Sequence, residues 1–318
     1  MIRYGILGCG GHALQSHALP GDYVPDLALE VVCDIRQESI DNFVKEYGKN
    51  LRSTTNSELF YRTNIEAVLI ATPDEFHLEN LRQAITANKH VLVEKPLAIN
   101  EDQLRELPEI FSEAEKRKLV IASCHPRRFD PPFLWLKEKT STLIKEIGPI
   151  IGFDFDFSYH KPTAVWKHDR SLMLDHLNHE IDLLNFLYGH GHFNAWLELD
   201  VFDRYQVAGV RSDGISFKFH GTRRLEENKF LEWARVRHER GEVVVDTSTG
   251  LATVHFHESN VVWTEKCGVT DYPLRFRRVM QNFADAILGK ADNYLTHKDL
   301  WINNCLGVKL QKWSKYSS

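Results

Sequence analysis

The sequence predicts an α/β domain with a doubly wound parallel sheet, followed by an α+β domain with an open, mainly antiparallel sheet. Up to residue 123, short apolar runs alternate with helix-like segments. Between about residues 193 and 266, strand-like runs instead follow one another without helices between them. A segment rich in Pro and Arg, HPRRFDPP at 125–132, separates these two patterns. We therefore place the domains at residues 1–123 and 124–318.

The bulk composition excludes several classes of protein. The chain has 318 residues, 39 Lys and Arg against 44 Asp and Glu, and a formal net charge of −5, so nothing favours nucleic acid or an anionic membrane as a partner. No apolar run approaches the ~18 residues of a membrane span, and no secretory leader pattern is present. The five cysteines are scattered, which fits a reducing compartment, so we expect a cytoplasmic protein.

The first strand leads into a glycine-rich turn. Residues 2–7, IRYGIL, are followed by GCGGHA at 8–13, which is the pattern G-x-G-x-x-A between a strand and a helix. In a dinucleotide-binding Rossmann domain Gly8 would make the tight turn, Gly10 would admit a pyrophosphate, and Ala13 would let the helix pack closely. The helix dipole would favour the anion there. We therefore expect the cofactor to contact Gly8, Gly10, Gly11, His12 and Ala13.

The second strand, LEVVCD at 29–34, ends in Asp34, a little over twenty residues after the glycine turn. A carboxylate at this position can accept hydrogen bonds from a ribose diol, and it can also cap the helix that follows. Because a carboxylate repels a 2′-phosphate, Asp34 favours NAD over NADP as the cofactor. Arg36 keeps NADP open as an alternative.

Three further strands complete the first domain. They are expected at 66–72, 90–96 and 119–123, with a helix at about 101–117 before the last. Continuous apolar strands of this kind lie inside a parallel sheet, and ligands bind at the carboxyl ends of such strands. Four strand ends carry candidate ligand-binding groups: the turn at 8–13, Asp34, Thr72 with Pro73, and the residues 94–96.

The second domain begins with a helical stretch to about residue 146 and an alternating strand at 148–160. A helix containing LDHLNHEID (174–182) follows, and strand-like runs then suggest an antiparallel sheet. Those runs lie at 193–202, 209–221, 229–247, 252–257 and 260–266, and helices at about 273–288 and 297–314 end the chain.

Lys95 is the first candidate for chemistry, because it stands at a strand end within the tripeptide Glu94-Lys95-Pro96. A lysine in a partly desolvated cleft has a lowered pKa, which suits proton transfer or polarisation of a substrate oxygen. The alternative is a surface lysine paired with Glu94.

The helix at 174–182 supplies the second candidate group. Asp175, His179 and Asp182 are spaced i, i+4 and i+7 and share one stripe. A hydride leaves an alcohol carbon only if the hydroxyl proton leaves too, and His179 could accept that proton while Asp175 orients it. A solvated helix face and a metal site are alternatives, but no second cluster at ligand spacing is evident, so no metal is expected.

These motifs together resemble the Gfo/Idh/MocA oxidoreductase family, the glucose–fructose oxidoreductase and inositol dehydrogenase relatives. The resemblance lies in GILGCGGHA, VVCD, ATPDEFH, HVLVEKPLA, RRFDP and D-x-x-x-H-E-I-D, in that order along nearly the whole chain. It implies a Rossmann domain, an open antiparallel sheet domain, NAD or NADP as cofactor, and sugars, cyclitols or their derivatives as substrates.

The resemblance also implies roles for individual residues. Lys95, Asp175 and His179 take the places of the family's catalytic residues. The loops on the nicotinamide side contain Thr72, Pro73, His77 and Glu94. On the substrate side we expect Arg127, Trp166 and His176, although His176 could instead be an exposed helix residue. One departure from the family is the absence of a glycine-rich run before the helix, where residues 169–173 read DRSLM, so we expect an unusual substrate or altered access.

The expected function is hydride transfer between nicotinamide and a hydroxyl or carbonyl carbon of a sugar-like or cyclitol-like substrate. A nucleotide-binding regulator of the same fold without turnover is the alternative. Because the open sheet is rich in Phe, Trp and Val, we expect it to expose an apolar patch. Pairing of that patch between copies predicts a homodimer or homotetramer.

Overall fold

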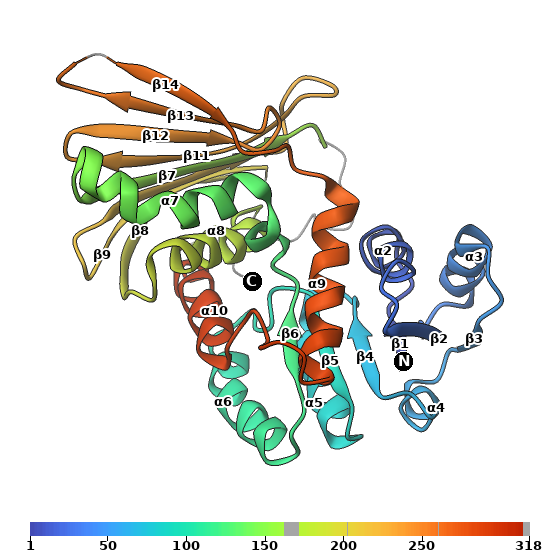
Figure 1. The fold of residues 1–318 in the computed structure, drawn as a ribbon. Coiled ribbons are helices and arrows are strands. Elements are labelled where there is room, and N and C mark those ends of the chain that lie inside the picture. Colours follow the sequence, from blue (N-terminus) through green and yellow to red (C-terminus); the bar gives the residue numbers. More distant parts are fainter. Residues whose placement is uncertain (162–171, 202, 260, 314–318) are drawn as a thin grey trace. The chain divides into compact units, whose positions relative to one another are not determined.

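The computed structural model describes residues 1–161, 172–201, 203–259 and 261–313 (Figure 1). Their contacts form two compact units, the first being Met1–Pro126 with Tyr272–Asn304 and the second Arg127–Asp271 with the residues from Cys305 on. This division differs from the expected boundary at 123/124, because helix α9 (Tyr272–Ile287) packs on the first unit, against the helical stretch that follows the glycine turn.

The first unit contains a six-stranded sheet of order β3-β2-β1-β4-β5-β6. Every pairing in it is parallel, which confirms the predicted doubly wound sheet. All four residues of β4 are buried, as expected of a strand covered on both faces. The strands are β1 (Ile2–Leu7), β2 (Leu27–Cys33), β3 (Arg52–Thr54), β4 (Ala67–Ile70), β5 (His90–Val93) and β6 (Ile121–Ser123).

Helices cover both faces of this sheet. On one face, Phe60, Leu81 and Leu107 from three helices join the strands in one hydrophobic cluster. On the other lies a helical stretch formed by α1 (Gly11–Ala13), η1 (Leu14–Ala18) and α2 (Leu19–Gly21), in which η1 is a π turn. The remaining helices are α3 (Gln37–Tyr47), α4 (Ser57–Tyr61), η2 (Asp74–Phe76), α5 (His77–Thr86), α6 (Glu101–Lys116) and α10 (His297–Gln311), and α10 belongs to this unit only up to Asn304.

The second unit contains an eight-stranded sheet of order β14-β13-β12-β11-β7-β10-β9-β8. Its strands pair antiparallel except for β7 with β10, which confirms the predicted, mainly antiparallel sheet. The strands are β7 (Ile150–Tyr159), β8 (Phe193–Val201), β9 (Arg204–Arg211), β10 (Ser216–Thr222), β11 (Phe230–His238), β12 (Gly241–Asp246), β13 (Leu251–Phe256) and β14 (Val262–Lys266). The helical segments are η3 (Pro126–Phe129), α7 (Pro131–Ile147) and α8 (Leu172–Tyr188).

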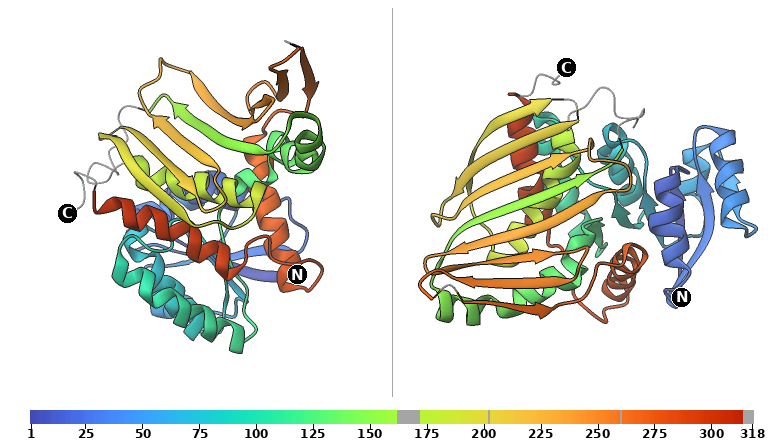
Figure 2. Two further views of the ribbon diagram at one scale, coloured as in Figure 1. Left: turned by 90° about the vertical axis from the view of Figure 1, so that its left-hand side faces the viewer. Right: turned by 90° about the horizontal axis from the view of Figure 1, so that it is seen from above.

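Helices α7 and α8 cover one face of the eight-stranded sheet, and the strands lie in front of them in the right-hand view of Figure 2. Strand alternation turns Phe153 and Phe155 of β7 toward these helices, where both are buried. Asp154 and Asp156, which alternate with these phenylalanines along β7, point to the opposite face. Along β7, therefore, the open face carries acidic side chains, and Phe153 and Phe155 face the helices instead.

An ion pair and a carboxylate–imidazole contact bridge neighbouring strands on the open face. Asp154 lies 3.2 Å from the Arg237 guanidinium, and Asp156 lies 2.9 Å from the His220 imidazole. Trp196 on β8 remains 49% exposed. No helix in the described parts of the chain has both the length and the apolar character needed to span a membrane.

Candidate functional site

The glycine turn brings the end of β1 against the residue that follows β4. Gly8 has φ +99°, and a Cβ added to it would lie 2.5 Å from the Ala71 carbonyl oxygen, so only glycine fits there. Gly10 and Gly11 differ, because a Cβ at either would meet no atom within 4 Å. The helix starts at Gly11 without a side-chain cap. Its first N–H groups therefore border open space, and this arrangement fits a pyrophosphate.

Asp34 lies beside this turn, immediately after β2. Its Oδ2 accepts the Cys9 N–H at 2.9 Å, and its Oδ1 accepts the Arg36 N–H at 2.9 Å. The carboxylate is thus fixed at both oxygens, and each oxygen keeps a lone pair for a further donor. Helix α3 has no side-chain cap, so the alternative role of Asp34 as its cap is not observed. The Arg36 guanidinium is exposed, with its Nε 3.9 Å from Asp34.

His77 connects the loops that follow β4 and β5. Its Nδ1 lies 2.7 Å from the Pro96 carbonyl oxygen and its Nε2 lies 2.7 Å from the Thr72 carbonyl oxygen. The ring is buried, and both nitrogens are occupied by backbone. His77 therefore positions the two loops, while Pro73 is exposed at the surface.

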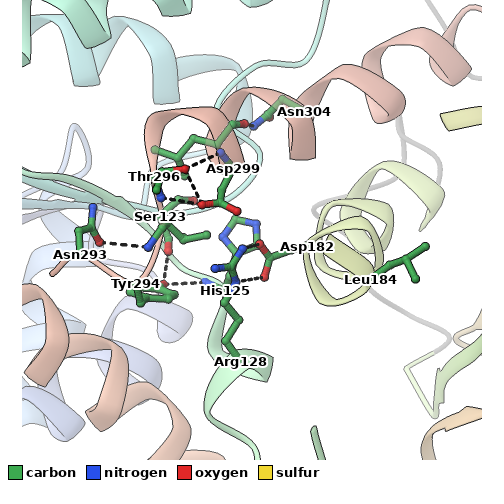
Figure 3. A network of polar contacts seen from close by, with 12 residues as sticks. Ser123, His125, Arg128, Asp182, Leu184, Asn293, Tyr294, Thr296, Asp299 and Asn304 are labelled. Carbon is green, nitrogen blue, oxygen red and sulfur yellow. Dashed lines mark hydrogen bonds and ion pairs between the residues drawn. The ribbon is translucent and has the colours of Figure 1, made fainter. Parts of the chain in front are cut away.

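Lys95 is partly exposed in the loop after β5, and the Lys95–Pro96 peptide is cis. The next two residues are held by the buried Asn304 of α10, whose Oδ1 accepts the Leu97 N–H at 2.9 Å and the Ala98 N–H at 3.1 Å. A polar network in Figure 3 holds the end of β6 in the same unit. In it the Tyr294 hydroxyl donates to the Ser123 carbonyl and accepts the His125 N–H.

Glu94 accepts hydrogen bonds from two histidines at one carboxylate oxygen. His12 Nε2 lies 3.0 Å and His17 Nε2 lies 2.6 Å from Glu94 Oε1. Burial by itself would raise the pKa of Glu94, but the two imidazoles outweigh burial and hold that pKa well below its ordinary value. His17 was not predicted from the sequence. It lies five residues after His12, and in a regular α-helix this spacing places two side chains on different faces.

The polar residues that were predicted to share one stripe of helix α8 differ in their exposure. Asp175 and His179 are partly exposed, one turn apart. Asp182 is 1% exposed, and its two oxygens accept the Arg128 guanidinium at 2.9 and 2.7 Å (Figure 3). Asp175 and His179 thus differ in burial from Asp182, which holds α8 to the segment after β6.

Two residues expected on the substrate side are buried in the second unit. Arg127 is 3% exposed and donates to Glu232 Oε1 at 2.6 Å, with its guanidinium 4.2 Å from the centre of the Phe157 ring. His176 is 2% exposed and packs against Phe157 and Tyr159, so it is not the exposed helix residue of the alternative interpretation. Trp166 lies outside the described residues, as do residues 169–171 of the departure from the family pattern.

The first unit therefore brings together the glycine turn, Asp34 and the loops after β4 and β5, all at the carboxyl ends of parallel strands. The second unit brings together Asp175 and His179. Within the described ranges, the cluster of three potential metal-binding side chains consists of His12, His17 and Glu94 and does not lie on α8.

Comparisons with known proteins agree with this arrangement. Residues 2–123 match the Gfo/Idh/MocA model, described as an oxidoreductase family with an NAD-binding Rossmann fold. Myo-inositol 2-dehydrogenase of Thermotoga maritima is 24% identical over 188 residues, 59% of this chain and 55% of that protein. Glucose-6-phosphate 3-dehydrogenase of Bacillus subtilis is 35% identical over 175 residues, 53% of this chain and 47% of that protein. The matched segment thus spans about half the length of these curated relatives.

Solved structures resemble the whole chain. A levoglucosan dehydrogenase in complex with NADH and levoglucosan aligns with a TM-score of 0.82 at 18% identity, covering 100% of this chain and 98% of the other. An apo scyllo-inositol dehydrogenase from Lactobacillus casei aligns with a TM-score of 0.80 at 19% identity, covering 99% and 96%. At such identities the likeness shows the fold, and it confirms the predicted pair of architectures.

Proposed function

Because residues 2–123 match the model of the Gfo/Idh/MocA oxidoreductase family, we propose that the chain is an NAD(P)-dependent oxidoreductase of sugar-like or cyclitol-like substrates. The reaction is hydride transfer between nicotinamide and a hydroxyl-bearing or carbonyl carbon. The observation that carries this proposal is the open space over Gly10 and Gly11 beside the fixed carboxylate of Asp34. The names of the relatives, inositol and glucose-6-phosphate dehydrogenases, support the substrate class.

The same residues support NAD as the cofactor. The N–H groups at the start of the helix after Gly10 would hold the pyrophosphate, and Asp34 would accept the ribose hydroxyls. Because two backbone N–H groups fix its oxygens, Asp34 cannot turn away from a 2′-phosphate, and this disfavours NADP. When bound, the nicotinamide supplies the hydride acceptor or donor.

Three side chains would handle the substrate. We assign proton transfer at the reacting hydroxyl to Lys95 and His179, because an alcohol carbon that loses hydride must also lose its hydroxyl proton. Asp175, one turn before His179, would orient the imidazole and stabilise its cationic form. Both residues of α8 are partly exposed, as contact with a substrate requires.

Turnover of a substrate panel tests the proposal. The full chain, with NAD and then NADP, is offered cyclitols, aldoses, anhydrosugars and sugar acids, and nucleotide reduction is followed by absorbance. With the best substrate we expect Lys95→Met and His179→Ala to lower kcat by about 100-fold or more, because each removes a proton-transfer group. The dissociation constant for NAD should stay within about twofold, since the nucleotide groups remain.

The exposed His257 provides a matched control, and His257→Ala should keep wild-type turnover. Wild-type turnover in His179→Ala would remove the proposed role of His179. Nucleotide binding without reduction of any substrate would favour the regulator without turnover.

We further propose that the chain forms a homodimer or homotetramer through the open face of the eight-stranded sheet. Trp196 supplies exposed apolar area there, and the cross-strand contacts of Asp154 and Asp156 supply charges of both signs.

A further inference from the structure

Two imidazoles and one carboxylate converge at the carboxyl ends of the strands of the first sheet. The ligand atoms His12 Nε2, His17 Nε2 and Glu94 Oε1 all lie within 4.8 Å of one another. Both imidazoles approach the same oxygen, at 3.0 and 2.6 Å. We propose that these three residues bind one divalent transition-metal ion of the Zn²⁺ class.

The backbone is shaped to make this convergence. In a regular α-helix, five residues advance by about 140° beyond a full turn, so His17 would face away from His12. The π turn at Leu14–Ala18 changes this, and it places both Ser16 and His17 on the side of His12. Such single π turns inside helices occur frequently at functional sites. Glu94 enters from the end of β5, so two elements contribute ligands.

The donor set suits the ion. Two imidazole nitrogens and one carboxylate oxygen form a common zinc donor set, which leaves further coordination positions open. Ligand atoms around a tetrahedral zinc lie about 3.3 Å apart, so small movements of the imidazoles from 3.0 and 2.6 Å would admit the ion.

The surroundings provide an outer shell and a path of entry. His12 Nδ1 lies 3.0 Å from Ser16 Oγ, which lies 3.2 Å from the Tyr272 hydroxyl, and this chain fixes the ring of His12. The His12 side chain is 50% exposed, so an ion can enter from its side. His17 Nδ1 is buried with no hydrogen-bond partner among the described residues, and we therefore expect weaker binding than in a structural zinc site.

Metal binding by the full chain tests the proposal. After stripping with chelator, the protein is dialysed against Zn²⁺ and its metal content measured, and Co²⁺ is added to follow visible absorption. We expect one ion per chain, with d–d bands typical of nitrogen and oxygen ligands. His12→Ala and Glu94→Gln should each weaken binding by about 100-fold. His297→Ala is the matched control, because His297 and Glu115 form a 2.9 Å pair without a third ligand, and its affinity should stay within about twofold.

Two outcomes would overturn the proposal: a wild-type chain that binds no ion, or variants that bind it as tightly as the wild type. Circular dichroism shows whether Glu94→Gln folds. If it does not, His12→Ala still tests the proposal, because the His12 side chain is half exposed. The readout is binding, not turnover, so it is independent of the oxidoreductase activity proposed above.

Discussion

Glu180, the residue after His179, carries a fully buried carboxyl group on the inner face of α8. The Tyr205 hydroxyl donates to its Oε1, and Oε2 has no hydrogen-bond partner among the described residues. Burial raises the pKa of Glu180 to about 8, although the Tyr205 hydrogen bond opposes the shift. Near neutral pH the native protein therefore holds Glu180 mainly in its protonated form.

This shift predicts a pH dependence of stability. The folded-state pKa lies above the ordinary value of 4.5, so between pH 4.5 and 8 the native chain keeps a proton that the unfolded chain has released. The contribution of Glu180 to the free energy of unfolding is fully present below pH 4.5 and is lost as the pH rises toward 8. Relative to the wild type, Glu180→Gln should gain up to about 1.4 kcal/mol of unfolding free energy per pH unit across this window.

Urea unfolding at several pH values measures this gain. Replacing the carboxyl by an amide also lowers the free energy of unfolding by an amount that does not vary with pH. Only the slope of the unfolding free energy against pH is therefore compared. Glu58→Gln changes an exposed carboxyl and should leave the slope as in the wild type. A Glu180→Gln slope equal to that of Glu58→Gln would contradict the prediction.

Individual side chains were predictable from the sequence only where their helix is regular. The i, i+4, i+7 spacing correctly aligned Asp175, His179 and Asp182 on α8. It could not show that Asp182 is buried with Arg128, because that partner comes from a distant segment. His17 escaped prediction since α-helical spacing assigns it to the wrong face, and the π turn has no sequence signal that we recognised.

Among the elements, α10 has a direct part in shaping the loop that contains Lys95. Asn304 supplies one oxygen to two backbone N–H groups, those of Leu97 and Ala98, and its Nδ2 donates to the Leu300 carbonyl. The loop residues Leu97 and Ala98 are buried, so their N–H groups depend on this acceptor in the native chain.

Asn304→Ala should therefore destabilise the protein by about 2–4 kcal/mol, because two buried N–H groups lose their acceptor. Denaturant unfolding measures the effect. Asn56→Ala, which removes the side-chain cap of α4 at 3.1 Å, should cost only about 1 kcal/mol. Equal costs for the two variants would show that the loop finds another acceptor.

The sequence predicted the elements that bury an apolar face and missed those that do not. The prediction for β1 agrees with the observed Ile2–Leu7, and the strands at 90–96 and 148–160 were found with longer bounds. Strand β3 is short and polar, and it pairs only with β2 at the sheet edge, so it has no apolar run to reveal it. The run at 209–221 proved to be two strands joined by a turn at Gly214, which has φ +86°.

At the scale of the whole molecule, the open sheet face is the surface through which we propose that copies of the chain associate. Its central strands carry paired charges, and its exposed Trp196 lies on β8 near one edge of the sheet. We expect sedimentation of the wild type as a dimer or tetramer, and of Trp196→Asp as a smaller species, because a carboxylate in a packed interface is costly to desolvate. Trp301→Asp changes a comparably exposed tryptophan of the first unit, at 42% against 49% for Trp196, and should keep the wild-type mass. A monomeric wild type would contradict this prediction.

Helical periodicity correctly predicted α9, but it could not show which unit the helix joins. An amphipathic stripe states that one face is buried, not what buries it. For this reason the boundary at 123/124 left residues 272–304 with the second domain, whereas their contacts place them in the first.

The return of the chain to the first unit has a consequence for its synthesis. The Leu97 and Ala98 N–H groups receive their acceptor from Asn304, which the ribosome adds some 200 residues later. At about 5–20 residues per second, residue 304 follows residue 126 by roughly 10–35 s. During this interval the second unit can fold as an insertion while the nucleotide-side loops still lack their last hydrogen bonds. A nascent first unit is thus exposed to chaperones and proteases longer than its position at the N-terminus suggests.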